Sequence, residues 1–352
     1  AAAAAAPIIL NVILIGSLFF SKWINISDVF TLSYAVSFAG LLQFLILLFF
    51  VRKNFKLILN IKVKIDDKIK FFFQKLIPSI FSSGVTQINI LVGTIIASFQ
   101  AGAVSYLYYA DRIYQINLAV AGIAVGTVML PELSKHVKNN SDDLITNLQN
   151  RALELCLFLS IPAGTALVLA SEEIVTSLFG YGSFDYESVT NTAIALTFFA
   201  FGVPAFSILK IFSNFFFARN NTKLPFYLSV ISVILNILIS VLFFGKLGFV
   251  IIPIATSISS WINVALHFYF IKKQNLHNFD RIFIYKFPRM IFSTVIMGAI
   301  LYFTLGFFSD KFDYNESWKI VYLFIIVSVS LLIYFFVSSF SGAFKLKDIK
   351  LR

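Results

Sequence analysis

Charged residues are scarce in this 352-residue chain. Only 13% of its residues are Asp, Glu, Lys or Arg, whereas about a quarter are charged in an ordinary soluble domain. Apolar residues make up 59% of the chain, 43 residues are Phe, and the mean hydropathy is +0.88. So little charge cannot cover the surface of a water-soluble protein. The composition therefore excludes soluble enzymes, collagens and disordered tails, and indicates a chain that lies largely in a lipid bilayer.

Cysteine and histidine are nearly absent. The single cysteine, Cys156, permits no internal disulfide and no cysteine-based metal site. The three histidines, His136, His267 and His277, are too far apart in sequence to indicate a metal cluster. The sequence also contains no recognisable nucleotide-binding loop, Ser/His/Asp triad or paired-carboxylate site. We therefore expect no enzyme activity and no cofactor, and this lack of catalytic motifs favours transport.

Long apolar runs are abundant, and ten of them approach or exceed the roughly 20 residues that a membrane-spanning helix needs. We predict an all-α integral membrane protein, a polytopic helical bundle with about ten transmembrane helices. Two of the predicted spans exceed the length of a straight crossing and should tilt, bend or break, the second of them at Pro204. The spans cover residues 1 to 20, 29 to 51, 77 to 108, 114 to 131, 152 to 171, 188 to 218, 225 to 244, 249 to 271, 288 to 308 and 318 to 340.

Basic residues are distributed unevenly between the two sides of these spans. If the gaps alternate inside and outside, starting inside at residue 1, then 22 of the 28 Lys and Arg residues fall in inside segments and five fall outside. This asymmetry is the positive-inside pattern of membrane proteins. The net charge of +11 therefore records orientation and not nucleic-acid binding. Because the number of spans is even, both ends of the chain are predicted to be cytoplasmic.

The segment from 52 to 76 alternates Lys with Ile, Leu and Phe and is too basic to cross a bilayer. It is predicted to lie on the cytoplasmic membrane surface as an amphipathic linker attracted to anionic headgroups, and an ordinary solvated linker is the alternative. Two spans precede this segment and eight follow it, which suits a hinge between two bundles. The opening AAAAAAP has no Met and differs from the remainder in composition, so the chain is interpreted as a fragment.

Charged residues near or within the spans are the candidates for function. Asp111 and Arg112 lie between the third and fourth predicted spans among several tyrosines, and they should face a polar cavity or the interface. The alternative for this pair is a short outer loop with an aromatic belt. Lys210 lies well inside the sixth span, where a lone ammonium costs about 2.5 to 3.5 kcal/mol unless it reaches water. Arg219 ends that span as a topological anchor or as a contact for an anionic ligand, and Glu154 should reach the cytoplasmic interface.

Polar uncharged residues concentrate in the third span, which carries more Ser, Thr, Asn and Gln than a lipid-facing helix needs. This helix is expected to be bent and to line a hydrated cavity. The glycines at the two ends of residues 122 to 126 are spaced GxxxG, which is more typical of close helix packing than of phosphate binding. The expected cavity-lining residues are Gln87, Asn89, Thr94 and Ser98.

Three motifs resemble those of a known family. They are YYADR at 108 to 112, GxxxGTxxLPxLSK at 122 to 135, and K-x7-AR-x3-K-x-P from Lys210 to Pro225. Together they resemble the MurJ family of lipid II flippases, which belongs to the MOP exporter superfamily with the MATE drug transporters. The resemblance covers nearly the whole chain. That family has fourteen spans in two six-helix lobes and an additional pair, so the ten spans here would match the last ten.

The resemblance also implies a division of the chain into domains. Residues 1 to 51 would be the last two helices of the first lobe, and 52 to 76 the linker. Residues 77 to 273 would form the second lobe. Residues 274 to 352 would hold the additional helix pair, which in the family forms a groove for a lipid tail, and the cytoplasmic tail of the chain.

The activity implied by the resemblance is movement of an undecaprenyl-pyrophosphate-linked peptidoglycan precursor, lipid II, to the outer leaflet of the bacterial inner membrane by alternating access. Its partners would be that precursor, membrane lipids and other cell-wall synthesis proteins, with no nucleic acid. Arg112 matches a functionally important arginine of the family, and Asp111 would orient it. Lys210 and Arg219 match basic positions in the later motif. Other essential arginines of the family lie in its first helices, outside this sequence.

Two alternatives remain at this point. A MATE-like multidrug or polysaccharide-lipid exporter would have the same fold, although the LPELSK segment disfavours it, and a non-transporting membrane scaffold belongs to another class. Some family members hold a sodium ion in the second lobe with the help of carboxylates. The matching regions here contain Gly93, Asn236 and Ser240 instead. We therefore expect no strong sodium site.

Overall fold

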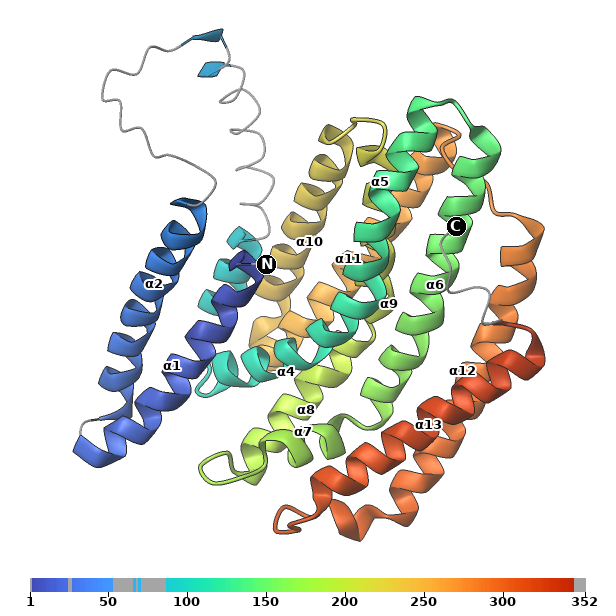
Figure 1. Cartoon of the computed structure of the whole chain (residues 1–352). Coiled ribbons are helices and arrows are strands. Elements are labelled where there is room, and N and C mark those ends of the chain that lie inside the picture. The colour runs from blue at the N-terminus through green and yellow to red at the C-terminus, as the bar shows by residue number, and fades with distance from the viewer. Residues whose placement is uncertain (1, 25–26, 53–65, 68, 71–86, 345–352) are drawn as a thin grey trace. The chain divides into compact units, whose positions relative to one another are not determined.

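The computed structural model describes residues 2–24, 27–52, 66–67, 69–70 and 87–344, and its regular elements there are helices throughout (Figure 1). The predicted all-α class is thereby confirmed for the described part of the chain. The chain divides into two compact units, residues 1–74 and 75–352. The division falls inside the predicted linker, 52 to 76. Most of that segment lies outside the described residues, so its amphipathic character stays a prediction.

The first unit is a helical hairpin. Its helices α1 (Ala2–Ile24) and α2 (Asp28–Arg52) pack against each other and correspond to the first two predicted spans. Ser21 closes the hairpin by donating a hydrogen bond from its Oγ to Oδ1 of Asp28 at 2.5 Å. Both helices are apolar around most of their circumference, as expected for helices in contact with lipid or with other transmembrane helices.

The second unit begins, in its described part, with the apolar helix Gln87–Ala97 and a turn at residues 98–102. From there α4 (Ala103–Leu118), the π-helical turn η1 (Ala119–Ala124) and α5 (Val125–Lys138) continue as one helical stretch. The predicted loop between the third and fourth spans was therefore misplaced. The chain turns at Gly102, whose φ of 76° suits glycine, whereas residues 108–118 contain no Gly or Pro to end a helix.

Helix α6 (Asp142–Leu169) follows, and a short helix α7 (Ser171–Phe179) leads to the predicted long sixth span. That span is broken, as its length predicts. Helices α8 (Tyr186–Ala200) and α9 (Val203–Phe217) meet at an angle of 41°, with Pro204 in the first turn of α9. Proline at this position removes a backbone N–H that lacks an intrahelical partner in any case.

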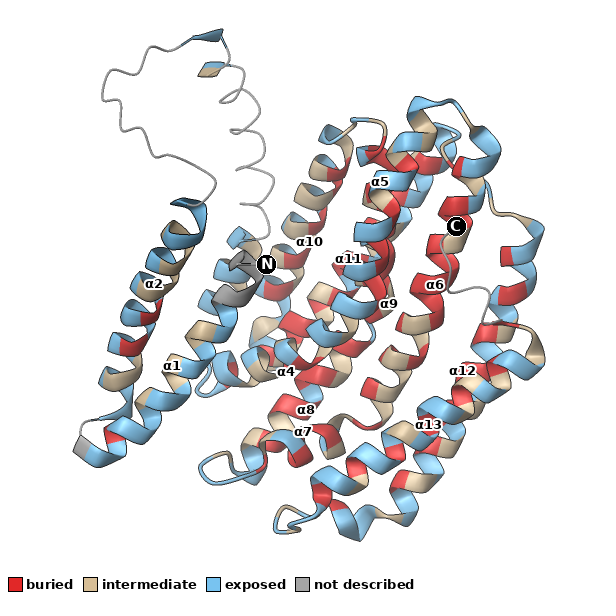
Figure 2. Cartoon of the chain, viewed as in Figure 1, coloured by how far each residue is buried: buried red, intermediate tan, exposed pale blue. Residues whose placement is uncertain are grey.

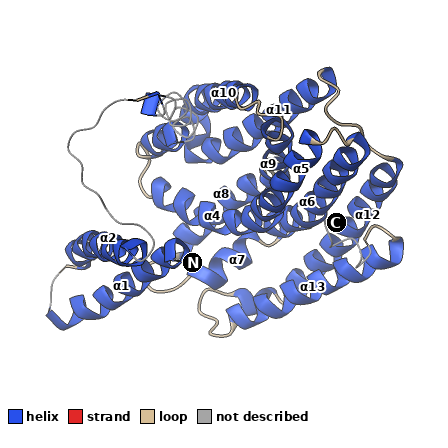
Figure 3. Ribbon diagram, turned by 45° about the horizontal axis from the view of Figure 1, so that its top comes forward, coloured by secondary structure: helices blue, strands red, loops and turns tan. Residues whose placement is uncertain are grey.

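Two further pairs of helices complete the second unit. The turn η2 (Gly248–Val250) joins α10 to α11, which pack together as a hairpin, and α12 packs against both α6 and α13. Figure 3 shows α12 and α13 side by side at one edge of this unit. The bounds are α10 (Lys223–Leu247), α11 (Ile251–Lys273), α12 (Arg281–Phe307), η3 (Ser309–Phe312) and α13 (Lys319–Ser341).

Six helices in the described part of the chain are long and apolar enough to span a membrane, or seven if α8 and α9 form one span. That count merges α10 with α11, although these helices have 25 and 23 residues and each is long enough alone. The other predicted spans correspond to the shorter apolar helices Pro7–Trp23 and Gln87–Ala97. The number ten thus depends on how broken and short helices are counted, while the membrane class does not.

The buried side chains of the second unit concentrate on α6 and α9 (Figure 2). Helices α10 and α13 expose large apolar side chains over much of their length, which suits contact with lipid or with other helices. Phe158 of α6 stands at the centre of one apolar cluster, and Tyr334 of α13 donates a hydrogen bond to its carbonyl at 2.8 Å. Packing therefore joins the last two helices directly to the core of this unit.

Candidate functional site

Arg112 lies on the exposed face of α4. Its guanidinium carbon is 4.7 Å from the centre of the Tyr108 ring, one helical turn earlier. Residues four apart share a face of a helix, so the YYADR spacing itself produces this stacking. A ring beneath the guanidinium attracts the cation and leaves its edge N–H donors available. The Arg112 guanidinium is therefore held in place on an exposed face of α4, with N–H groups available to donate hydrogen bonds to a ligand.

Asp111 makes its side-chain hydrogen bonds with other residues of α4. Its carboxylate accepts a hydrogen bond from the Gln115 amide, and Tyr114 also hydrogen-bonds to it. The Tyr114 ring packs against Phe199 with centres 4.9 Å apart, which fastens this part of α4 to α8. Successive residues on a helix point about 100° apart, and no ion pair joins Asp111 to Arg112 in the described part of the chain. The role of Asp111 in orienting Arg112 therefore stays a prediction.

Lys210 is exposed on α9, and its stem lies against η1. A Cβ atom built on Gly122 would be 3.1 Å from the Cα of Ser207 and 3.4 Å from the Cγ of Lys210. Four residues on, the side-chain amide of Asn214 donates to the carbonyl of Gly126 at 2.8 Å. The GxxxG spacing thus serves close helix packing, as the sequence indicates.

Arg112 and Lys210 do not form one cluster. Gly122, which Lys210 contacts, follows Arg112 by ten residues, or about 15 Å along a helix axis. The π-helical turn η1 lies between the two levels, and such turns inside α-helices are frequent at functional sites. The second unit therefore offers two positive charges, Arg112 on α4 and Lys210 on α9, at two different levels of the continuous stretch from α4 to α5.

Arg219 has a different setting from the other two basic candidates. Its guanidinium donates to the carbonyl of Phe215 at 2.7 Å and to that of Leu276 at 3.3 Å. Burial lowers the pKa of Arg219, and the charge of Asp142 opposes that shift. These bonds fasten the end of α9 to the connection between α11 and α12. Arg219 lies just beyond the end of α9, nine residues or roughly 13 Å of helical rise after Lys210, so the three predicted residues do not meet.

The four expected cavity-lining residues do not share one helix face. At 100° per residue, Gln87, Thr94 and Ser98 fall within about 40° of each other, but Asn89 points to the opposite side and is half-buried. The expectation of a single face is therefore wrong for Asn89. Thr94 and Ser98 donate to the backbone carbonyls of Ile90 and Ile95. Their hydroxyls are satisfied within the helix, and a cavity at this face stays a prediction.

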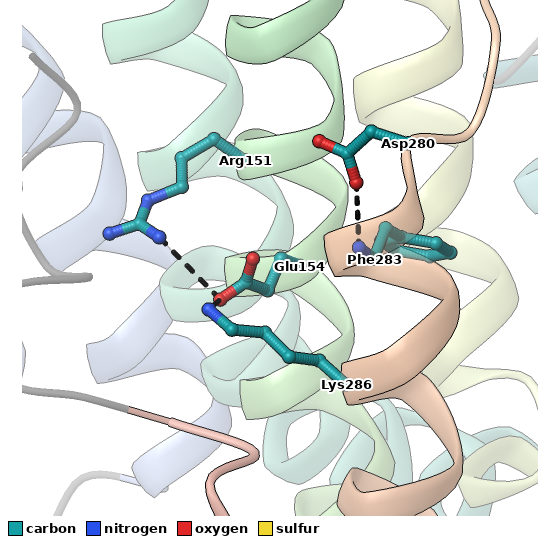
Figure 4. Close-up of polar contacts among 5 residues, drawn as sticks. All are labelled: Arg151, Glu154, Asp280, Phe283 and Lys286. Carbon is teal, nitrogen blue, oxygen red and sulfur yellow. Dashed lines mark hydrogen bonds and ion pairs between the residues drawn. The ribbon is translucent and has the colours of Figure 1, made fainter.

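A buried ionic cluster joins α6 to α12 (Figure 4). Lys286 donates to a carboxylate oxygen of Glu154 at 2.5 Å, and Arg151 lies 3.6 Å from the same oxygen. The Glu154 and Lys286 side chains are 5% and 8% exposed, so Glu154 does not reach the interface as expected. Asp280 caps the start of α12 by accepting from the backbone N–H of Phe283 at 2.6 Å. Lys286 is 132 positions from Glu154 in the sequence, so no local sequence pattern could have predicted this ion pair.

The region matching a sodium site in some family members contains amides and hydroxyls. Asn236 donates from Nδ2 to Thr256 at 3.0 Å and accepts at Oδ1 from Ser240 at 3.2 Å. No group of three or more Asp, Glu, His or Cys residues suited to a metal occurs among the described residues. The Asn236, Ser240 and Thr256 side chains are committed to hydrogen bonds with one another, and the expected lack of a strong sodium site stays a prediction.

An apolar groove of about 550 Å³ runs between α6 and α12. Gly298 allows the two helices to approach closely at this groove, since a Cβ there would be 3.2 Å from Thr165. The walls are mainly hydrocarbon and could accommodate a lipid chain. They include Ile161, Leu169, Ile291, Val295, Ala299 and Phe303.

Comparison with known proteins supplies the family. The sequence profile described as "Lipid II flippase MurJ" matches residues 1–323. The chain belongs to the MurJ family. It is 38% identical over 305 residues to a protein of Rhizobium meliloti (strain 1021) named "Probable lipid II flippase MurJ", covering 86% of this chain and 57% of that relative. A MurJ relative of the same name from Rickettsia prowazekii (strain Madrid E) is 36% identical over 282 residues, covering 79% and 55%.

Solved structures agree with this assignment. A structure titled "Lipid II flippase MurJ, inward closed conformation" superimposes with a TM-score of 0.76 at 27% identity, covering 96% of this chain and 66% of that one. An outward-facing MATE multidrug transporter of the MOP superfamily matches with a TM-score of 0.50 at 14% identity, covering 76% and 62%, and shows the shared fold alone. The chain spans little more than half the length of the curated MurJ relatives.

Proposed function

We propose that this chain forms part of a flippase that moves lipid II from the cytoplasmic to the outer leaflet of the bacterial inner membrane. The observation that carries the proposal is the Arg112 fork on the open face of α4, in a chain that belongs to the MurJ family. Such movement changes no covalent bond, so the protein has to supply binding sites and two alternating openings. The proposed partners are lipid II, membrane lipids and cell-wall synthesis proteins.

The headgroup contact is assigned to Arg112. A guanidinium can donate two parallel charge-assisted hydrogen bonds to a pyrophosphate, and the Tyr108 ring already holds it in place before the ligand arrives. Lys210 supplies a second charge at another depth, where a compact ammonium can follow the moving phosphate. Arg219 donates to two backbone carbonyls, so its contribution is to hold α9. Asp111 holds α4 through Gln115.

The hydrocarbon part of the substrate has a different requirement. A long prenyl chain can stay in an apolar environment while the headgroup crosses, and the groove between α6 and α12 offers such a surface. The cavity assigned to Gln87, Thr94 and Ser98 would face the headgroup, while Asn89 is assigned to helix packing. The positive-inside pattern supports a cytoplasmic position for the end of α9 and the start of α12.

The test is substitution of Arg112 in the full-length protein in a flippase-depleted strain. Arg112→Ala should abolish growth, and Arg112→Lys should restore it only partly, because an ammonium cannot reproduce the planar fork. Arg281→Ala, at an exposed arginine at the start of α12, is the matched control and should grow normally. Full growth with Arg112→Ala at normal membrane levels would remove Arg112 from the headgroup site.

A further inference from the structure

Lys319, the first residue of α13, is completely buried. Its ammonium donates to the carbonyls of Gly180 and Tyr314, both at 2.7 Å, and lies 4.1 Å from the centre of the Tyr181 ring. In the described ranges no carboxylate is within ion-pair distance of it. Burying a charge is costly unless hydrogen bonds and ring faces replace water. The positions of its partners are therefore constrained, because any movement away from Lys319 would leave a buried charge with fewer hydrogen bonds.

The contact extends beyond one side chain. Tyr314 donates from its hydroxyl to the carbonyl of Phe184 at 2.9 Å, and Ser177 of α7 donates to the backbone carbonyl of Lys319 at 3.4 Å. The connection between α12 and α13 therefore holds residues 180–184, the segment between α7 and α8, at several points.

The same segment holds α4 through aromatic side chains. The Tyr109 ring of α4 packs against Phe179 with centres 4.8 Å apart and against Phe184 with centres 5.1 Å apart. Tyr109 also adjoins Tyr108, the residue on which Arg112 is stacked. A shift of residues 179–184 would therefore move the rings against which Tyr109 packs. Because Tyr109 is part of α4, this would rotate α4 and change the direction in which Arg112 points.

We propose that Lys319 is a positioning residue for Arg112. The α12–α13 pair would then set the orientation of α4 through residues 179–184, in addition to the part that α12 plays as a wall of the apolar groove. The inference rests on the proposed role of Arg112 in headgroup binding. Lys319 itself touches no substrate and acts through Tyr109.

The first measurement follows the local structure of α4. Ser105→Cys places a thiol of similar size on the exposed face of α4, and the native Cys156 is buried. Lys319→Met, which keeps the length and removes the charge, should raise the maleimide labelling rate at position 105 about five-fold. Asn139→Cys, beyond the far end of α5, should change less than about two-fold. Lys311→Met, an exposed lysine in the same connection, should leave both rates unchanged.

The second measurement is a double-mutant cycle on lipid II transport. Tyr109→Leu and Lys319→Met should each slow transport about five-fold, and the double variant should be no slower than either, because both changes interrupt one route. Tyr109→Phe keeps the ring and should retain transport. Effects that multiply in the double variant would show that Lys319 acts elsewhere and would overturn the inference.

A milder variant covers the case in which Lys319→Met fails to fold. Tyr314→Phe removes only the hydroxyl that donates to Phe184 and should shift labelling at position 105 in the same direction by a smaller factor. Unchanged labelling in a folded variant would overturn the positioning role while leaving the flippase proposal intact. Normal growth of Arg112→Ala would instead remove Arg112 from the headgroup site whatever the labelling rate at position 105, so the two failures are distinguishable.

Discussion

The side-chain amide of Asn214 donates to the carbonyl of Gly126 at 2.8 Å, across the contact between α9 and α5. The amide nitrogen stands 3.0 Å from where a Cβ on residue 126 would lie. Asn214 is buried and so has no ready access to water as a replacement partner. The absence of a side chain at position 126 is therefore a condition for this hydrogen bond.

Gly126→Ala should destabilise the protein, because displacement of the amide leaves a buried polar group without its partner, at about 1 to 3 kcal/mol. Gly245→Ala in α10 is the matched control, since nothing lies within 4 Å of its Cβ position. That control should be neutral or gain up to about 1 kcal/mol from helix propensity. Unfolding free energies in detergent would compare them, and equal values for the two variants would contradict the packing role.

The ion pair between Glu154 and Lys286 predicts a non-additive pair of substitutions. Lys286→Met should cost about 3 kcal/mol, since it leaves a buried carboxylate without its nearest partner. Adding Glu154→Gln should recover part of that loss because the uncompensated charge is gone. Lys273→Met, at an exposed lysine, is the control for loss of charge alone. A double variant less stable than Lys286→Met would show that Glu154 is held mainly by other partners.

His277 predicts a pH dependence of stability. Burial, and then the charges of Lys272 and Arg219, lower the pKa of His277 from 6.5 to about 4. Between pH 4 and 6.5, His277 binds a proton in the unfolded chain but not in the folded chain. The contribution of neutral His277 to the free energy of unfolding is therefore complete above about pH 6.5 and is lost as the pH falls towards 4. Roughly 1 kcal/mol should be gone at pH 5.5.

The measurement is thermal unfolding in detergent at pH 7 and 5.5. His277→Asn keeps a polar side chain opposite Gln149 and should reduce the pH effect. His136→Asn, at a less buried histidine, is the matched control and should leave the effect unchanged. An undiminished effect in His277→Asn would assign it to other groups.

Thiol labelling should test the predicted orientation in intact cells. Ser183→Cys, between α7 and α8, should react with an impermeant maleimide from outside, whereas Asn139→Cys, between α5 and α6, should react only after permeabilisation. Both sites are exposed. The basis is the concentration of Lys and Arg in the segments assigned to the cytoplasm. Labelling of both from the same side would reject the orientation.

Much of the fold could be predicted because lipid imposes long apolar helices. The break near Pro204 followed from span length and from proline chemistry. The loop at Asp111 and Arg112 was misplaced because charge was read as the end of a span, whereas Gly102 carried the better signal. A charged residue does not by itself end a helix, and Asp111 has a hydrogen-bond partner four residues on in the same helix, at Gln115.

The candidate site could be predicted in part. The stacking of Arg112 on Tyr108 depends only on their separation of four residues in one helix, and the YYADR motif shows that separation directly. The contacts of Lys319 and of Glu154 depend on residues 139 and 132 positions away, and periodicity carries no information about such pairs. Asn89 was assigned to the wrong face because polarity alone was counted, without the 100° step between residues.

The separation of Glu154 from Lys286 also bears on how the protein is made. At about 5 to 20 residues per second, a ribosome needs roughly 7 to 26 s to add the intervening 132 residues. During that time α6 has left the ribosome while the lysine that pairs with its carboxylate does not yet exist. Helix α6 therefore reaches its final environment only after α12 has been synthesised, and a ribosome stalled before residue 286 leaves an acidic helix without that partner.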